Sequence, residues 1–261
     1  MKQTITSIIK SKGVRKLSMI TAYDALFAKL FDNEVDMILV GDSLNMSFAG
    51  QDDTLSIGMD QMLYHTKAVC SGAPNTFIIC DMPFGTYVNE MTALKNAISV
   101  YHKTKADAVK IEGGKSKVNI IRYLTQNSIA VVGHIGLLPQ NVRSEGGYKI
   151  KGKDVQDIQL LILDAKAVEQ AGAFMIIVEG VKPEAAKAIT QAVNIPVVGI
   201  GAGVDTDGQV LVWSDMLGFF EEFKPKFVRR YLDGASLVKQ SVKQFVSDIE
   251  DKKFPSYEET Y

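Results

Sequence analysis

Short apolar runs recur along the chain, and most of them end in a glycine or a polar residue. The clearest is Met37–Val40, four apolar residues followed by Gly-Asp-Ser. An unbroken apolar run of this length is typical of a strand that is buried on both faces, as in a parallel sheet. Runs of this kind predict eight strands, at residues 17–22, 37–40, 76–81, 107–112, 129–134, 174–179, 196–201 and, most weakly, within 216–220.

Between these runs, apolar residues recur at helical spacing, which predicts amphipathic helices. Asp24 is placed to cap one of them. The stretches 44–58 and 143–153 lack either period, and we expect them to be long connections. The expected helices cover residues 4–11, 24–31, 59–71, 90–104, 116–126, 154–171, 183–193 and 226–251.

The alternation of strands and helices predicts the fold class. Each strand is separated from the next by a helix, so successive strands need crossover connections and run parallel. Right-handed units of this kind, eight in a row, close into a (βα)8 TIM barrel. A doubly wound open sheet remains the alternative, because alternation alone does not distinguish the two. We expect residues 1–261 to form a single barrel domain, with a short N-terminal helix before it and C-terminal helices that end the chain.

Net charge and the lengths of the apolar runs bear on whether the protein binds nucleic acid or a membrane. The 261 residues carry a net charge of −1, so there is no overall field to attract nucleic acid or an anionic membrane. No apolar run approaches the ~18 residues of a membrane span, and the first residues lack the apolar core of a signal peptide. We therefore expect a cytoplasmic protein. Cys70 and Cys80 are expected to be reduced thiols, because Cys80 lies within an apolar strand.

Candidate chemistry lies at the ends of the predicted strands. Asp42, Asp81, Glu112, His134 and Glu179 end strands two to six. In a barrel these ends meet at one face. One such acid often does no more than cap the next helix, but four gathered in one mouth repel each other unless a cation compensates. Oxygen ligands without a histidine–cysteine cluster favour Mg²⁺ over zinc.

Two basic residues share this predicted mouth. Lys110 precedes Glu112 by two positions, so both side chains point to the same side of their strand. Lys110 either binds a substrate carboxylate or enolate, or forms a structural pair with Glu112, and the spacing leaves both open. His134 is either a hydrogen-bonded structural residue or a base. The glycine-rich Gly199–Gly203 is interpreted as a tight turn, since it does not match a dinucleotide-binding loop.

From the residues alone, these features indicate a Mg²⁺-dependent barrel enzyme that acts on an oxo acid. Several motifs then resemble the ketopantoate hydroxymethyltransferase (3-methyl-2-oxobutanoate hydroxymethyltransferase) family, in order and over nearly the whole chain. They are Val40–Ser43, Asp81–Phe84, Val109–Gly114, Gly133–Gln140, Gly146–Lys149, Val178–Glu179, and Gly199–Gly203 with Thr206–Gln209.

The resemblance implies an activity and an assembly. The family transfers a hydroxymethyl group from methylenetetrahydrofolate to 3-methyl-2-oxobutanoate (α-ketoisovalerate). The reaction passes through a Mg²⁺-stabilised enolate and gives 2-dehydropantoate (ketopantoate) for pantothenate and coenzyme A biosynthesis. Its members are TIM barrels that assemble as homodecamers of two pentameric rings. Mg²⁺ is the implied cofactor, and the folate is the one-carbon donor.

The resemblance also implies residue roles. Asp42, Asp81 and Glu112 match the family's metal ligands. Ser43 and Lys110, together with Asp42 and Asp81, match the residues that bind the keto acid. Glu179 matches the proton acceptor, while the spacing does not settle whether Glu179 or His134 moves the proton.

Two other functions remain open at this point, and four positions differ from the usual family pattern. The alternatives are a Mg²⁺-dependent C–C lyase of the phosphoenolpyruvate/pyruvate barrel group and a non-catalytic barrel that binds a keto acid or a metal. Asn45 stands where glycine is usual, and because asparagine tolerates left-handed backbone we expect the turn to survive. The other departures are Ser56 for proline, Lys151 for glutamine and Ser214 for histidine.

Overall fold

A computed structural model of the chain describes residues 2–221 and 224–261. The chain divides into two compact units, residues 1–212 and 213–261. In the first unit, eight parallel strands form a closed barrel in which each strand pairs with its neighbours in chain order and β8 pairs with β1. The strands are β1 (Leu17–Thr21), β2 (Met37–Val40), β3 (Phe77–Asp81), β4 (Ala108–Glu112), β5 (Val131–Gly136), β6 (Met175–Glu179), β7 (Val197–Ile200) and β8 (Gly208–Leu211). The predicted TIM barrel is confirmed.

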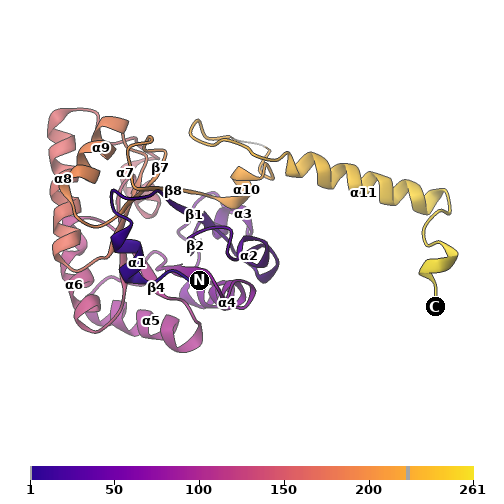
Figure 1. The fold of residues 1–261 in the computed structure, drawn as a ribbon, viewed down its shortest axis with the longest axis horizontal. Coiled ribbons are helices and arrows are strands. Elements are labelled where there is room, and N and C mark those ends of the chain that lie inside the picture. Colours follow the sequence, from indigo (N-terminus) through magenta and orange to yellow (C-terminus); the bar gives the residue numbers. More distant parts are fainter. Residues whose placement is uncertain (1, 222–223) are drawn as a thin grey trace. The chain divides into compact units, whose positions relative to one another are not determined.

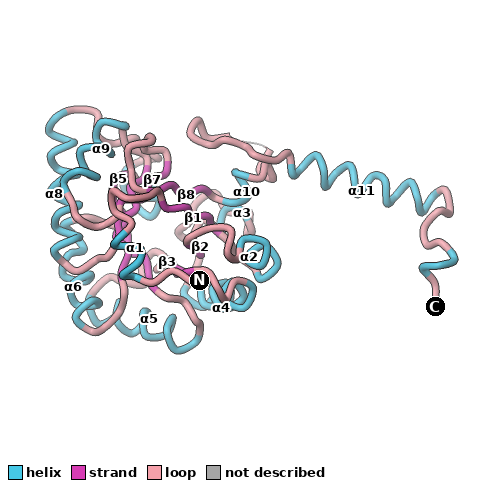
Figure 2. The backbone as a smooth tube through the Cα atoms, viewed as in Figure 1, coloured by secondary structure: helices cyan, strands magenta, loops and turns pink. Residues whose placement is uncertain are grey.

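Helices surround these strands in the first unit (Figures 1 and 2). Several begin at the residue types that cap helix ends, such as Asp24 before α2 and Asn89 before α5. The helices are α1 (Ile5–Lys10), α2 (Ala25–Phe31), α3 (Leu44–Ser47), α4 (Met59–Gly72), α5 (Glu90–Lys103), η1 (Lys115–Lys117), α6 (Val118–Gln126), η2 (Pro139–Asn141), α7 (Val142–Glu145), α8 (Val155–Gln170) and α9 (Pro183–Ala192).

The inside of the barrel is filled by alternate residues of the strands. A cluster of buried side chains includes Met37 and Leu39 of β2, Phe77 and Ile79 of β3, and Met175 of β6. Because side chains alternate between the two faces of a strand, the residue two positions further along each of these strands also points into the barrel. This register decides which side chains reach the carboxyl end of the barrel.

The eighth strand was predicted in the wrong place. It is Gly208–Leu211, which pairs with both β1 and β7 and so closes the barrel. This strand contains a glycine and a glutamine, so its apolar signal is weaker than that of residues 216–220. That later run ends the short helix α10 (Trp213–Met216) and turns at Gly218, whose φ is +70°.

The second unit consists of α10, a connection, the long helix α11 (Gly234–Glu250) and η3 (Tyr257–Glu259). The helices expected over 226–251 are therefore one helix that begins later than predicted. Trp213 packs on Phe219, and Phe245 packs on Phe254, each with ring centroids 5.4 Å apart. Among the described residues, no helix has the length and apolar composition needed to cross a membrane.

Candidate active site

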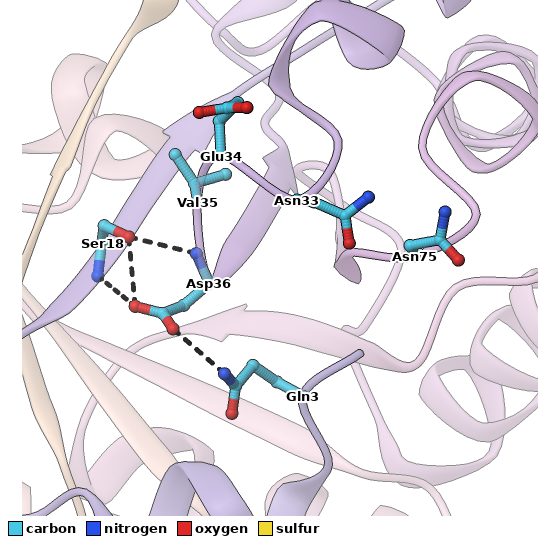
Figure 3. Close-up of a pocket in the computed structure, with 7 residues that line it drawn as sticks. All are labelled: Gln3, Ser18, Asn33, Glu34, Val35, Asp36 and Asn75. Carbon is cyan, nitrogen blue, oxygen red and sulfur yellow. Dashed lines mark hydrogen bonds between the residues drawn. The ribbon is translucent and has the colours of Figure 1, made fainter. Parts of the chain in front are cut away.

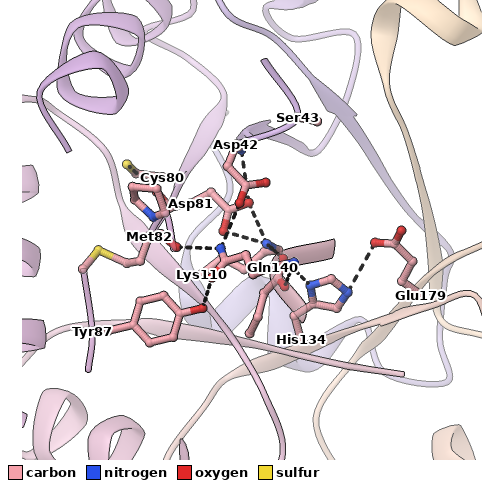
Figure 4. Close-up of polar contacts among 12 residues, drawn as sticks. Asp42, Ser43, Cys80, Asp81, Met82, Tyr87, Lys110, His134, Gln140 and Glu179 are labelled. Carbon is pink, nitrogen blue, oxygen red and sulfur yellow. Dashed lines mark hydrogen bonds and ion pairs between the residues drawn. The ribbon is translucent and has the colours of Figure 1, made fainter. Parts of the chain in front are cut away.

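The three acids proposed as metal ligands do meet at the carboxyl end of the barrel. Asp42, Asp81 and Glu112 are buried, and a carboxylate oxygen from each lies within 4.8 Å of the others. Figure 4 shows Asp42 and Asp81 next to Lys110. Asp81 and Glu112 are inward-pointing residues of β3 and β4. Asp42 lies two residues beyond the end of β2, in the turn that leads into α3. This cluster of acids has the donor set of a site for a hard divalent cation.

Lys110 lies among these acids. Its Nζ is 2.6 Å from both carboxylate oxygens of Asp81 and 3.3 Å from Oε1 of Glu112. Asp81 and Lys110 are register partners on neighbouring strands, and Lys110 and Glu112 lie on one face of β4, as the spacing predicted. The acids in turn hold the pKa of Lys110 above its usual value against the effect of burial, so its side chain stays charged.

The acids differ in how their charge is compensated. Burial, together with the charges of Asp81 and Glu112, raises the pKa of Asp42 well above its usual range. Burial also raises the pKa of Asp81, although Lys110 offsets part of that effect. Burial alone would raise the pKa of Glu112 as well, but Lys110 and His134 outweigh it and lower this pKa to about 2. Of these three carboxyl groups, Asp42 is therefore the one whose negative charge is least compensated by neighbouring groups.

His134 connects the acid cluster to Glu179. Its two ring nitrogens lie 3.3 Å from Oε1 of Glu112 and 3.3 Å from Oε2 of Glu179. The histidine is buried, whereas the side chain of Glu179 is 23% exposed. Burial lowers the pKa of His134, but the two carboxylates prevail and raise it to about 9. At neutral pH the metal-free site thus contains an imidazolium between two carboxylates.

Ser43 follows Asp42 in the turn that leads into α3. Its hydroxyl is 2.8 Å from the hydroxyl of the buried Tyr23, in the segment after β1. The carbonyl of Tyr23 is in turn 2.6 Å from Nδ1 of His65 in α4. The hydroxyl of Ser43 is therefore held next to the acids by a contact from a neighbouring strand end.

Two residues of this network were missed by the sequence reasoning, Gln140 and Tyr87. The side-chain amide of Gln140 donates to Oδ2 of Asp42 at 2.8 Å and accepts a hydrogen bond from the hydroxyl of Tyr87. Neither residue is charged, and both lie outside the strands. The sequence signal that could have found one of them is the motif Gly133–Gln140, which ends at this glutamine.

The two long connections are tied together near this end of the barrel. Asp53, in the connection after β2, pairs with Arg143 of α7 through contacts of 3.0 and 2.9 Å. Both connections contain more structure than predicted, since α3 and α7 lie within them. In the glycine-rich segment after β7, Gly201 and Gly203 have positive φ angles, as the predicted tight turn requires.

A separate polar pocket of 240 Å³ lies at the opposite ends of the strands (Figure 3). Ser18 of β1 and Asp36, just before β2, line it. The carboxylate of Asp36 accepts hydrogen bonds from Ser18, Gln3 and Arg15. Because the carboxylate of Asp36 is already hydrogen-bonded, we interpret this end of the barrel as contributing to stability. Active sites of TIM barrels lie at the carboxyl ends of the strands.

Comparison with known proteins shows the family to which the sequence is similar. The family model described as ketopantoate hydroxymethyltransferase matches residues 2–257. A protein of Aliarcobacter butzleri named 3-methyl-2-oxobutanoate hydroxymethyltransferase is 68% identical, with 100% of this chain and 97% of that protein covered. A protein of the same name from Nitratiruptor is 62% identical, with 100% and 99% covered.

Among solved structures, phosphonopyruvate hydrolase in complex with oxalate and Mg²⁺ has a similar fold. The TM-score is 0.63 at 14% sequence identity, and the match covers 98% of this chain and 92% of that one. At this identity the likeness concerns the fold alone.

Proposed function

This chain belongs to the ketopantoate hydroxymethyltransferase family, and we propose that it transfers a hydroxymethyl group from methylenetetrahydrofolate to 3-methyl-2-oxobutanoate. The product would be ketopantoate, for pantothenate and coenzyme A biosynthesis. The observation that carries the proposal is the buried group of Asp42, Asp81 and Glu112 with Lys110 among them, in a chain that matches the family model over residues 2–257.

Asp42, Asp81 and Glu112 would hold a Mg²⁺ ion. With these acids ionised and Lys110 protonated, the four groups carry a formal charge of −2, which a divalent cation neutralises. Their ligand atoms are all oxygens, as Mg²⁺ prefers. When bound, the ion would act as a Lewis acid toward the keto oxygen and carboxylate of the substrate.

Lys110 and Ser43 would orient the keto acid beside the acids. The ammonium of Lys110 is buried and charged, so it can attract a carboxylate or a developing oxyanion. The hydroxyl of Ser43, held by Tyr23, provides a neutral hydrogen bond. Holding the substrate in this way would present its C3 proton to a base and restrict its motion during the reaction.

Glu179 is the better candidate for the base that removes the C3 proton. His134 has a pKa of about 9 in the metal-free site, so at neutral pH it already carries a proton. Glu179 reaches the mouth with 23% of its side chain exposed and is paired with that imidazolium at 3.3 Å. We therefore assign proton removal to Glu179 and its orientation to His134.

The two alternatives are less well supported. The lyase alternative rests on the barrel fold, which at 14% identity carries no information about the reaction. The family match and relatives at 68% and 62% identity favour the transferase. A non-catalytic barrel would not need the ordered set of acid, lysine and histidine that the site contains.

We also propose a homo-oligomer, in line with the decamer that the family resemblance implies. Helix α11 has apolar side chains at positions 238, 242, 245 and 249, each about half exposed. This spacing places them on one face of the helix, which is typical of a surface that packs against another helix. Light scattering should give a mass of ten chains of 28.6 kDa. A monomeric mass would contradict the proposal.

Exchange of the C3 proton of 3-methyl-2-oxobutanoate in D₂O, followed by NMR, tests the proposed function. We expect Mg²⁺-dependent exchange without folate, lost in Asp81→Ala and in Glu179→Gln and retained in the control Asp36→Asn at the opposite end of the barrel. Adding methylenetetrahydrofolate should then give ketopantoate. No exchange from a folded protein that binds Mg²⁺, even with folate present, would overturn the transferase assignment.

A further inference from the structure

Gln140 makes hydrogen bonds through both ends of its side-chain amide in the mouth of the barrel. It lies in η2, after β5, and is buried. Its backbone N–H donates to Oε2 of Glu112 at 3.1 Å, and its side-chain Nε2 donates to Oδ2 of Asp42 at 2.8 Å. The same nitrogen donates to the carbonyl of Met82 at 3.0 Å, and Oε1 accepts from the hydroxyl of Tyr87 (Figure 4).

The direction of this amide is fixed by its partners. A backbone carbonyl only accepts hydrogen bonds, so the NH₂ group of Gln140 must face the carbonyl of Met82, and the same nitrogen then reaches Asp42. Its oxygen then faces Tyr87, which donates. Burial, with the nearby Glu112 and Asp81, raises the pKa of Tyr87 well above its usual value and keeps this phenol protonated. A rotated amide would place its oxygen against the carbonyl oxygen of Met82.

Asp42 depends on this contact more than the other acids do. Asp81 and Glu112 belong to strands and are held by Lys110. Asp42 lies in a turn, and within residues 2–221 and 224–261 its carboxylate receives a hydrogen bond from Gln140 alone. Gln140 thus donates one hydrogen bond to each of two acids, from its side chain to Asp42 and from its backbone N–H to Glu112.

We propose that Gln140 is a positioning residue that presets the carboxylates of Asp42 and Glu112 for a divalent cation, and that Tyr87 keeps its amide in the required direction. The inference rests on the proposed function, to which the cation belongs. Groups that orient metal ligands by hydrogen bonds strengthen binding, because the ligands do not have to be ordered when the ion arrives.

Three variants separate the parts of this proposal. Gln140→Met keeps the length of the side chain, removes the hydrogen bonds of its amide and leaves the backbone N–H on Glu112, and we expect the dissociation constant for the cation to rise about 10- to 100-fold. Gln140→Glu restores an acceptor for Tyr87 but places an oxygen against Asp42, so it should not rescue binding. Tyr87→Phe removes one neutral hydrogen bond and should weaken binding about 2- to 10-fold.

The matched control is Gln209→Met. Gln209 lies in β8. Its amide donates to the carbonyl of Gly203 at 2.8 Å and to Oγ1 of Thr206 at 2.9 Å, both in the segment between β7 and β8. The variant therefore loses as many donated side-chain bonds as Gln140→Met, without a contact to the acids. Its affinity for the cation should stay that of the unchanged protein.

The probe is Mn²⁺, whose free concentration is read from its electron paramagnetic resonance signal, with Mg²⁺ titrated by calorimetry for comparison. A positioning role also predicts that rising Mg²⁺ restores the C3 exchange rate of Gln140→Met to the unchanged protein's saturating value. A purely structural role would lower the melting temperature and leave the metal affinity of the folded fraction unchanged.

The outcomes distinguish this inference from the proposed function. Unchanged Mn²⁺ affinity in Gln140→Met overturns the inference, while exchange by the unchanged protein still decides the function. Should Gln140→Met fail to fold, unchanged affinity in Tyr87→Phe overturns it instead. An unchanged protein that binds Mn²⁺ but does not exchange C3 refutes the function alone, and one that binds no Mn²⁺ refutes both.

Discussion

The buried ammonium of Lys110 offers a direct test of how the acid cluster is balanced. Its side chain is 4% exposed, and it contacts Asp81 at 2.6 Å and Glu112 at 3.3 Å. Lys110→Met keeps the apolar stem but removes the ammonium that pairs with Asp81, and it leaves Glu112 with His134 as its cationic partner. Removing one partner of a buried pair costs about 3–5 kcal/mol, because the other charge stays buried.

This cost translates into a large thermal effect. At about 2–4 °C per kcal/mol for a domain of this size, the melting temperature of metal-free Lys110→Met should fall by about 6–20 °C. Lys2→Met is the control, because Lys2 pairs with Asp107 at 2.8 Å with side chains 32% and 26% exposed. Such a pair contributes at most about 1 kcal/mol.

The assay is thermal unfolding followed by circular dichroism, in EDTA and in excess Mg²⁺, at one protein concentration. A cation at 100 times its dissociation constant adds about 2.7 kcal/mol to the stability of the state that binds it. Because the variant's acids lack Lys110, its deficit should shrink when Mg²⁺ is added. If Lys110→Met melts within the range of Lys2→Met in EDTA, the acids are not held ionised beside the lysine and the reasoning fails.

Three further predictions concern stability, reactivity and the support of the base. Burial raises the pKa of Asp36, but hydrogen bonds led by that from Arg15 lower it below 3.8. Asp36→Asn should therefore reduce the melting temperature above pH 3.8, with the deficit vanishing as pH falls; equal deficits at neutral and acid pH would contradict this. Burial raises the pKa of Cys80 to about 12, so Ellman's reagent should not react with it before unfolding, and a fast native reaction would refute this. At Gly136, φ is +96° and an added Cβ would lie 2.4 Å from the carbonyl oxygen of Glu179. Gly136→Ala should slow C3 exchange about 10- to 100-fold, and an unchanged rate would show that this contact does not support the base.

The residues that could be predicted from the sequence are those whose direction the strands dictate. Asp81, Lys110, Glu112 and His134 follow the same alternation as the apolar side chains inside the barrel. Once the strands are located, the alternation of side chains between the two faces of a strand is sufficient to predict that these four side chains meet at one end of the barrel. Because β8 contains few apolar residues, the same reasoning placed it too late in the chain.

The positions of residues in the connections between strands and helices could not be predicted in this way. Gln140 lies in a single turn of 3₁₀ helix and Tyr87 in the segment after β3, where the chain path follows no period. Their meeting depends on how two connections fold over the same strand ends. An uncharged amide and a phenol also give no electrostatic signal in a sequence, although here they orient the acids that do.

The departures from the family pattern at Asn45 and Ser56 show the same dependence on the connections. We expected asparagine to be tolerated through left-handed backbone, but Asn45 lies within the right-handed turn of α3. Its side chain matters instead, since Nδ2 donates to the carbonyl of Asp53 at 2.7 Å and to Oγ of Ser56 at 2.9 Å. Glycine and proline at these positions would have neither the donor nor the hydroxyl. Asn45 and Ser56 therefore help to hold the connection whose Asp53 also binds Arg143.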